Sequence, residues 1–382
     1  MKVRLGDVCD FYSGTGFPNE FQGKKNGEFP FYKVGDISKN VLSGHQNLIY
    51  CENYIDSNVV NKIKGTIIPA DTVVFAKIGE ALKLNRRAIT TCDCLIDNNT
   101  IGIKARTSKI RNLYFYYFMC NLDIQKLAES TTVPSVRKTK LMNVEIILPD
   151  INEQESIERL LNKITKLIYY RKQQLKKLDE LVKSRFIEML GEPLKNNKKW
   201  KTKKLKLIAP ANEFTGDIEA NGKMYWLLQL DMIESNTGKV LNKNLVTLDE
   251  IGASTIKFSS DNVLYSKLRP YLNKVVLPDE PGFATSEIIP LLPNEELNKI
   301  FLAFLLRDNG IVRFLNAHVS GSKMPRVQAD IFWNLDIILP TITLQNQFAD
   351  FVKQTDKSKL EIQKSLDKLE ILKKSLMQKY FG

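Results

Sequence analysis

The second part of this sequence repeats the first. Residues 136–191 align without a gap onto residues 327–382, at a constant offset of 191 positions. Within the aligned segments, Asn143–Pro149 (NVEIILP) corresponds to Asn334–Pro340 (NLDIILP). A register that holds through a whole segment indicates two copies of one structural module.

Each copy predicts a short buried strand that leads into a helix. The strands are residues 144–148 and 335–339, and each is ended by a proline, which cannot donate to a sheet ladder. Asn152 and Thr343 then stand where helix N-caps are expected.

Apolar residues recur at alternating steps of three and four through both helices, which predicts a coiled-coil seam. About 37 residues at 1.5 Å each make a rod of roughly 55 Å. The connectivity favours antiparallel pairing, with one globular domain at each end and a pseudo-twofold axis; the alternative is that each helix lies along its own domain. The predicted seam residues are Ile157, Leu160, Ile164, Leu167, Leu175, Leu178 and Leu181, and Phe348, Phe351, Ile362, Leu366, Leu369, Leu372 and Leu376.

The repeat extends more weakly into the preceding segments, which predict mixed α/β domains with more strand than helix. Apolar and polar residues alternate at 72–78 and 263–268, as in strands. The aromatic run 114–118 is interpreted as core rather than as a base-stacking surface, because its counterpart at 300–306 stays apolar but loses most of the aromatic residues. We therefore expect an α+β chain with a first domain at 1–150, a spacer helix at 151–191, a second domain at 192–341 and a second spacer helix at 342–382.

The charge balance favours a polyanionic partner. The chain has 56 Lys and Arg against 43 Asp and Glu, a formal net charge of +13. Phosphate contacts and counterion release give such a protein sequence-independent affinity for double-stranded DNA. The alternative is an AT-rich genome that encodes lysine freely.

Candidate DNA contacts lie near strand ends and in loops. A polar loop at 130–137, which contains Pro134, aligns with residues 321–328, which contain Pro325. Basic side chains there are suited to phosphate or guanine contacts; the alternative is that they are solvated surface charges. The loops differ between the halves, which implies an asymmetric target. The candidates are Lys77, Lys83, Arg86, Arg87, Ser135, Arg137 and Lys138 in the first half, and Lys267, Arg269, Tyr271, Lys274, Ser322, Lys323 and Arg326 in the second.

The sequence offers few residues suited to catalysis. Only two histidines occur, and the five cysteines show no metal-ligand spacing. The segment Phe11–Gly16 is interpreted as a turn or a DNA-facing loop rather than a cofactor loop. No catalytic residue and no bound metal are expected, and the cysteine usage and lack of a long apolar run favour a cytoplasmic protein that does not contact membranes.

The organisation resembles that of the specificity subunits of type I restriction-modification systems. The strand-proline-helix segments carry the resemblance, Ile146–Pro149 with Gln154 and Ile337–Pro340 with Gln345, and so does the segment Leu264–Asn273. Residues 74–84 depart from the latter pattern. The resemblance implies two target-recognition domains that read the halves of a bipartite site, with helices that set the spacing.

The resemblance also implies partners. Two methyltransferase subunits would dock on the helices, and endonuclease subunits would join through them. S-adenosylmethionine, ATP and Mg would bind those partners, and no cofactor is expected in this chain. Two other functions stay open: a coiled-coil scaffold with two protein-binding domains, and a self-contained DNA-modifying enzyme.

Overall fold

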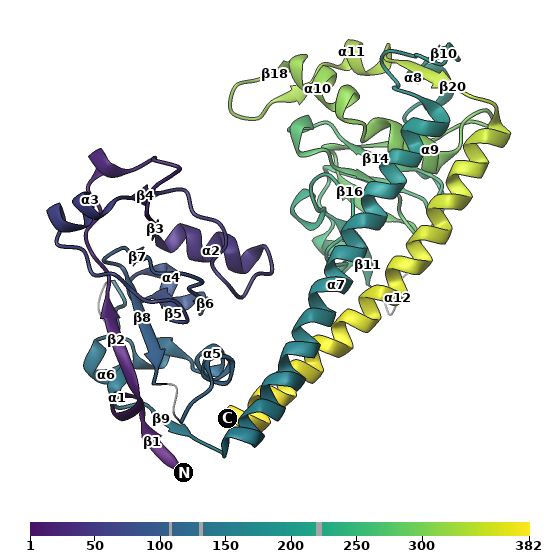
Figure 1. Cartoon of the computed structure of the whole chain (residues 1–382). Helices are drawn as coiled ribbons and strands as arrows, with labels where there is room; N and C mark the ends of the chain where they lie inside the picture. The colour runs from purple at the N-terminus through teal and green to yellow at the C-terminus, as the bar shows by residue number, and fades with distance from the viewer. Residues whose placement is uncertain (107–108, 130–132, 219–223) are drawn as a thin grey trace. The chain divides into compact units, whose positions relative to one another are not determined.

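The computed structural model describes residues 1–106, 109–129, 133–218 and 224–382 (Figure 1). The chain forms two compact units, which we call unit 1 (Met1–Gln174 with Ile362–Gly382) and unit 2 (Leu175–Glu361). Two long helices, α7 (Ile151–Leu190) and α12 (Ile342–Phe381), each contribute one segment to each unit. Each unit therefore contains one globular module and helical segments from both repeats.

Besides a two-stranded pair near its N-terminus, the described part of unit 1 contains two small sheets. The four-stranded sheet has the order β2-β8-β5-β6 and is antiparallel throughout. In the three-stranded sheet, β4-β3-β7, the β3 and β7 strands are parallel. The strands are β2 (Cys9–Ser13), β3 (Phe29–Tyr32), β4 (Tyr54–Ile55), β5 (Val73–Ala76), β6 (Ala88–Ile89), β7 (Leu95–Ile96) and β8 (Thr100–Ala105), and the helices include α2 (Val34–Leu42), α3 (Ser57–Lys62), α4 (Glu80–Lys83), α5 (Asn112–Asn121) and α6 (Lys138–Met142).

Unit 2 repeats the central part of this topology. Its sheet β15-β14-β17 corresponds to β6-β5-β8, and its parallel pair β11 and β16 corresponds to β3 and β7. Two further strands extend the second sheet to the order β12-β11-β16-β13. The elements are β11 (Tyr225–Leu228), β12 (Asn244–Val246), β13 (Thr255–Phe258), β14 (Val263–Ser266), β15 (Val275–Val276), β16 (Gly282–Thr285), β17 (Ile288–Leu291), α9 (Lys299–Leu306), α10 (Asn309–Ala317) and α11 (Ala329–Trp333).

The repeated strand lies where the sequence predicts it. In unit 1, β9 (Glu145–Ile147) pairs antiparallel with β1 (Lys2–Arg4). In unit 2, β20 (Asp336–Leu339) pairs in the same way with β10 (Lys201–Lys204). The prediction of a mixed α and β chain with a repeated module is confirmed.

The repeated glutamines fasten each helix to its module. Gln154 is fully buried; its Nε2 donates to the carbonyls of Lys109 and Pro149, both at 3.0 Å, and its Oε1 accepts from the Arg111 amide at 3.0 Å. Gln345 is equally buried and makes the same three bonds with other residues, the carbonyls of Glu296 and Pro340 and the amide of Asn298, at 2.9–3.0 Å. Buried amides that satisfy backbone groups on both sides fix the position of a helix.

The helical segments run antiparallel within each unit. In unit 1, Lys172 of α7 forms an ion pair with Glu370 of α12 at 2.8 Å, while the earlier α7 residue Leu161 shares a core with the later α12 residue Met377. In unit 2, Asp179 pairs with Lys359 at 2.7 Å, and the Phe186 and Phe348 rings lie 5.3 Å apart. Within each unit, later residues of α7 therefore pack against earlier residues of α12.

The phase of the predicted seam is wrong at four positions. Leu160, Leu167, Leu181 and Leu372 are 38–48% exposed. The covered positions are one residue later: Leu161 and Val182 are buried, and Ile168 and Lys373 are partly buried. Two adjacent apolar rows, such as Leu160 beside Leu161, satisfy the same three-and-four spacing, so periodicity alone does not identify the covered row.

The other predicted seam residues are covered. Ile157, Ile164, Phe348 and Leu366 are buried, and the remaining ones are partly buried: Leu175, Leu178, Phe351, Ile362, Leu369 and Leu376.

Each core is completed by a helix that belongs to the other repeat. In unit 1, Met377 and Phe381 at the end of α12 pack on α5, with the Phe381 ring 5.1 Å from that of Tyr114. In unit 2, Val182 and Phe186 of α7 pack on α9. The aromatic run at 114–118 is buried, as predicted.

We predict that Gln345→Ala lowers the melting temperature of the chain by about 5 °C, because the truncation leaves buried backbone groups unpaired at a cost of about 2 kcal/mol. Gln347→Ala, at an exposed position of the same helix, is the control and is expected to change it little. Scanning calorimetry measures both. Equal shifts for the two variants would contradict the role of Gln345.

Candidate nucleic-acid interface

In unit 1, the loop that precedes α6 lies against the end of β5. Ile78, just after β5, bridges to Ser135 in this loop. Three backbone hydrogen bonds hold the arrangement: Lys77 N to Asn99 O at 2.8 Å, Val136 N to Lys77 O at 3.0 Å, and Gly79 N to Pro134 O at 2.8 Å. We call these residues, 77–79, 99 and 134–136, junction 1.

Unit 2 builds the same arrangement from different residues. Leu268, just after β14, bridges to Arg326. The three hydrogen bonds recur: Lys267 N to Glu287 O at 3.0 Å, Val327 N to Lys267 O at 3.0 Å, and Arg269 N to Pro325 O at 2.7 Å. We call these residues, 267–269, 287 and 325–327, junction 2. The prediction that the two proline-containing loops are equivalent is confirmed.

The turn after each strand needs a left-handed backbone. Gly79 has a φ of 78° and Arg269 a φ of 50°. Glycine takes a positive φ without strain, whereas an arginine takes it at some cost. The two turns nevertheless differ, because ψ is −169° at Gly79 and 64° at Arg269.

The side chains at equivalent junction positions differ in charge. Junction 1 has Asn99 and Ser135, and junction 2 has Glu287 and Arg326. The Arg326 guanidinium lies 2.6–3.1 Å from the Glu287 carboxylate. This hydrogen-bonded pair lowers the pKa of Glu287 and raises that of Arg326.

The remaining candidates of unit 1, apart from Arg87, are exposed or partly exposed. Arg137 is exposed and forms an ion pair with Glu129 at 2.9 Å, and Lys83 pairs with Glu80 at 2.7 Å. Lys138 is exposed and Arg86 partly exposed. Ser130, Thr131 and Thr132 of the predicted loop lie outside the described residues.

In unit 2, the exposed candidates are Arg269, Tyr271, Ser322 and Lys323. They belong to the two loops that meet at junction 2, together with the partly exposed Lys267 and Arg326. The structure thus gathers most of the predicted residues around the two junctions.

Two candidates do not fit a DNA contact. Arg87 is only 3% exposed; its guanidinium donates to Asn85 Oδ1 at 2.6 Å and lies 4.5 Å from the Phe75 ring centre. Burial lowers the pKa of Arg87 to about 10. Lys274 donates from Nζ to the Leu230 carbonyl at 2.5 Å, and burial lowers its pKa. Each of these side chains stabilises its own module, because its donor groups point inward.

Sequence reasoning missed Asn99 and Glu287. Neither lies in the repeated segment, and each reaches its junction only through strand pairing. The alignment of Lys77 with Lys267 could have pointed to them. The sheet register places Asn99 opposite Lys77 and Glu287 opposite Lys267.

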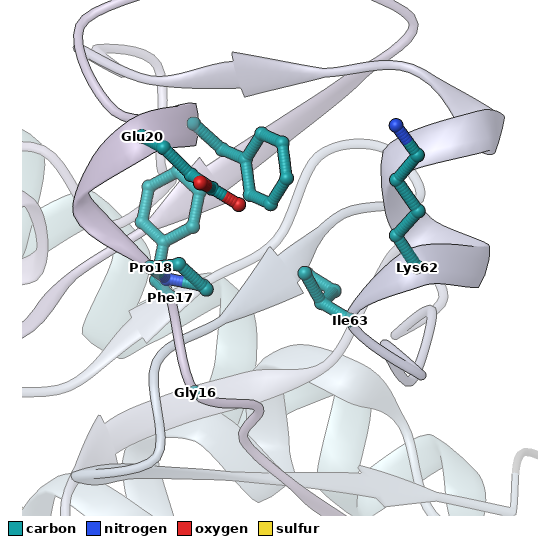
Figure 2. A pocket seen from close by; sticks show the side chains of 7 residues that line it. Gly16, Phe17, Pro18, Glu20, Lys62 and Ile63 are labelled. Carbon is teal, nitrogen blue, oxygen red and sulfur yellow. The ribbon is translucent and has the colours of Figure 1, made fainter.

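A hollow lies beside the segment Phe11–Gly16, which the sequence predicts to be a turn or a DNA-facing loop rather than a cofactor loop. Figure 2 shows it between the 3-10 turn η1 (Asn19–Phe21) and α3, with Lys62 on α3 across from Glu20. Gly14 in this region meets the Asp97 carbonyl so closely that a Cβ atom would overlap it. This glycine is therefore required for packing. The residues that line the hollow are Gly16, Phe17, Pro18, Glu20, Phe21, Lys62 and Ile63.

Within residues 1–106, 109–129, 133–218 and 224–382, no group of three or more His, Cys, Asp or Glu side chains is arranged as a metal site. Among the helices in this part of the chain, none combines the length and apolarity needed to cross a membrane.

We predict that Arg87→Ala lowers the melting temperature by about 5 °C, because it removes buried hydrogen bonds and ring contacts worth about 2 kcal/mol. Arg86→Ala, at the adjacent and partly exposed position, is expected to shift it by about 1 °C or less. Thermal unfolding followed by circular dichroism checks both. An unchanged melting temperature for Arg87→Ala, with weaker DNA binding, would restore Arg87 as a contact.

Comparisons with known proteins agree with this architecture. The family described as "Type I restriction modification DNA specificity domain" matches residues 1–180 and 197–371. The chain is 22% identical over 349 residues to the type I restriction enzyme EcoDI specificity subunit of Escherichia coli, an alignment that covers 76% of this chain and 77% of the relative. It is 21% identical over 318 residues to the MjaVIII specificity subunit of Methanocaldococcus jannaschii, covering 74% and 72%.

Solved structures share the fold. The crystal structure of a type I restriction-modification S subunit from M. genitalium has a TM-score of 0.56 at 14% identity, over all of this chain and 96% of that one. A chain from a structure on complex assembly and conformational transition of the type I R-M system has a TM-score of 0.58 at 15% identity, over all of this chain and 97% of that one. With a family match over both repeats, the chain belongs to the type I restriction-modification DNA specificity family.

Proposed function

We propose that each unit of this specificity subunit reads one half of a bipartite, asymmetric DNA site. The observation that carries this proposal is the pair of junctions, which share their backbone hydrogen bonds but differ in side chains. A shared backbone arrangement presents the side chains in the same geometry, while Asn99 and Ser135 in one junction, and Glu287 and Arg326 in the other, suit different bases.

The charged loops around the junctions supply the sequence-independent part of the affinity. Lys83, Arg137 and Lys138 in unit 1, and Lys323 in unit 2, are exposed and suited to phosphate contacts. The net charge of +13 supports the same partner.

We further propose that two copies of one methyltransferase subunit dock on the long helices. Lys177, Leu181 and Ser184 of α7 are exposed, and their equivalents Lys368, Leu372 and Ser375 of α12 are the same residue types and are also exposed. The spacing of four and three places each set on one helix face. Packing within the chain gives no reason for identical exposed residues, whereas two identical partners do.

In this proposal the chain itself is non-catalytic. S-adenosylmethionine would bind the methyltransferase subunits, and ATP and Mg would serve the endonuclease subunits that join them. A self-contained enzyme would instead bind S-adenosylmethionine or nick DNA as an isolated chain, and a protein-binding scaffold would keep all its interactions without DNA.

We predict that the isolated chain binds duplex DNA with a steep salt dependence. With on the order of six phosphate contacts, the affinity falls roughly a thousandfold between 50 mM and 200 mM salt. Sequence preference is expected to sharpen when the methyltransferase subunits of the same organism are added. Fluorescence anisotropy with labelled duplexes measures both. A steep salt slope without any sequence preference in the full complex would refute the assignment.

We predict that Leu181→Glu and Leu372→Glu each weaken the binding of one methyltransferase copy by about tenfold or more, because a charge replaces an apolar contact. The melting temperature is expected to change little, since both side chains are exposed. Isothermal titration gives the affinity and the number of copies bound. Ile371→Glu is the matched control, because Ile371 is 69% exposed and its equivalent, Glu180, is already acidic. Equal losses for the control and Leu372→Glu would argue against this docking surface.

A further inference from the structure

Arg326 is the most firmly positioned of the partly exposed basic side chains at the junctions. Its Nε lies 2.9 Å from Glu287 Oε2, and its Nη2 lies 2.6 Å from Glu287 Oε1. The two bonds are side by side, so they fix the plane of the guanidinium as well as its position. The side chain nevertheless stays about two-fifths exposed, which leaves part of it accessible.

The backbone of Arg326 is held on both sides. Arg326 pairs with Ser320 in the ladder of β18 (Val319–Ser320) and β19 (Arg326–Val327), and it bridges to Leu268 on the other side. The carbonyl of Glu287 is in turn bonded to the Lys267 amide. Both members of the ion pair therefore start from fixed backbone positions, and the pair loses little conformational entropy when a ligand binds.

The ion pair with Glu287 uses only some of the N–H donors of the Arg326 guanidinium. A guanidinium has five N–H groups in a rigid plane, and the bonds to Glu287 use the edge formed by Nε and Nη2. The far edge, formed by Nη1 and the second hydrogen of Nη2, presents two parallel donors. Guanine offers two adjacent acceptors, O6 and N7, in the major groove, and this is the base that a bidentate arginine recognises.

The Glu287 carboxylate favours a base rather than a phosphate as the ligand of Arg326. Glu287 places a negative charge against the guanidinium, and this charge would repel a phosphate group at the same place. Lys323, three positions earlier in the same loop, is exposed and is better suited to the phosphate backbone. Arg326 therefore combines precise orientation with reduced net charge, which favours recognition of a neutral base edge.

We propose that Arg326 recognises a guanine in the half-site read by unit 2, and that Glu287 is the positioning residue that orients it. This inference rests on the proposed function. At the equivalent positions, unit 1 has Ser135 and Asn99, which lack this charged fork. The guanine contact is thus a property of one half-site only.

The test is a selection from randomised duplexes by the full chain in complex with the methyltransferase subunits of its own organism. The variants are Arg326→Ala, Arg326→Lys and Glu287→Gln, with Lys323→Ala as the control. The wild-type complex is expected to select a guanine at one position of one half-site. Arg326→Ala and Arg326→Lys are expected to lower that preference by about 5- to 150-fold. The other positions, including the whole second half-site, keep their preferences and report an intact fold.

Glu287→Gln separates orientation from simple structural support. It keeps the shape of the side chain but removes the charge, so the guanine preference is expected to fall in part while the melting temperature and the other half-site are unchanged. Lys323→Ala is expected to weaken binding to all sequences alike and to reduce the salt slope by about one.

Two outcomes overturn the inference. One is that Arg326→Ala weakens binding uniformly, as a phosphate contact does, and the other is that it leaves all preferences intact. The proposed function fails in a different way, namely if the wild-type complex selects no sequence at all.

Discussion

Met377 and Phe381, at the far end of α12, fill the core of unit 1, and Val182 and Phe186 of α7 fill the core of unit 2. Neither globular module closes its apolar core with residues of its own repeat alone. Burial of large apolar side chains is the main term that stabilises a fold, so each module depends on a helix supplied by the other repeat. The ion pairs Lys172–Glu370 and Asp179–Lys359 then favour the antiparallel match.

The buried glutamines couple this helical packing to the modules. Gln154 and Gln345 each satisfy three backbone groups where a strand leads into a long helix. A side chain in this role has almost no freedom to change, because a shorter or apolar replacement would leave buried groups unpaired. This explains why the strand-proline-helix segment is the best preserved part of the internal repeat.

The junctions follow a different rule. Their geometry is set by backbone hydrogen bonds, which do not depend on the side chain, so the exposed positions are free to vary while the arrangement persists. Asn99 with Ser135, and Glu287 with Arg326, are two such variations. A chain built in this way can change what it recognises without changing how it folds, which suits a DNA specificity subunit.

Much of the fold is predictable from the sequence, and the limits have physical causes. The constant offset identifies the repeat, the strand before each proline and both long helices. The covered row of the seam is not identifiable, because Leu160 and Leu161 are equally apolar and only the neighbouring domain decides which is buried. Arg87 illustrates a second limit: its basic neighbours suggest a surface loop, yet its own side chain turns into the core. Glu287 illustrates a third, because strand pairing brings it to Arg326 from 39 residues away.

Mapping of the methylated sites in a genome tests the central claim most directly. The chain would be expressed with the methyltransferase subunits of its own organism in a host without competing systems, and modified bases would be located by sequencing native DNA. The two junctions share their backbone hydrogen bonds and differ in their side chains. We therefore expect one bipartite site, with two half-sites of different sequence separated by a fixed gap. Methylation at a palindromic site, or at a single uninterrupted one, would contradict the account.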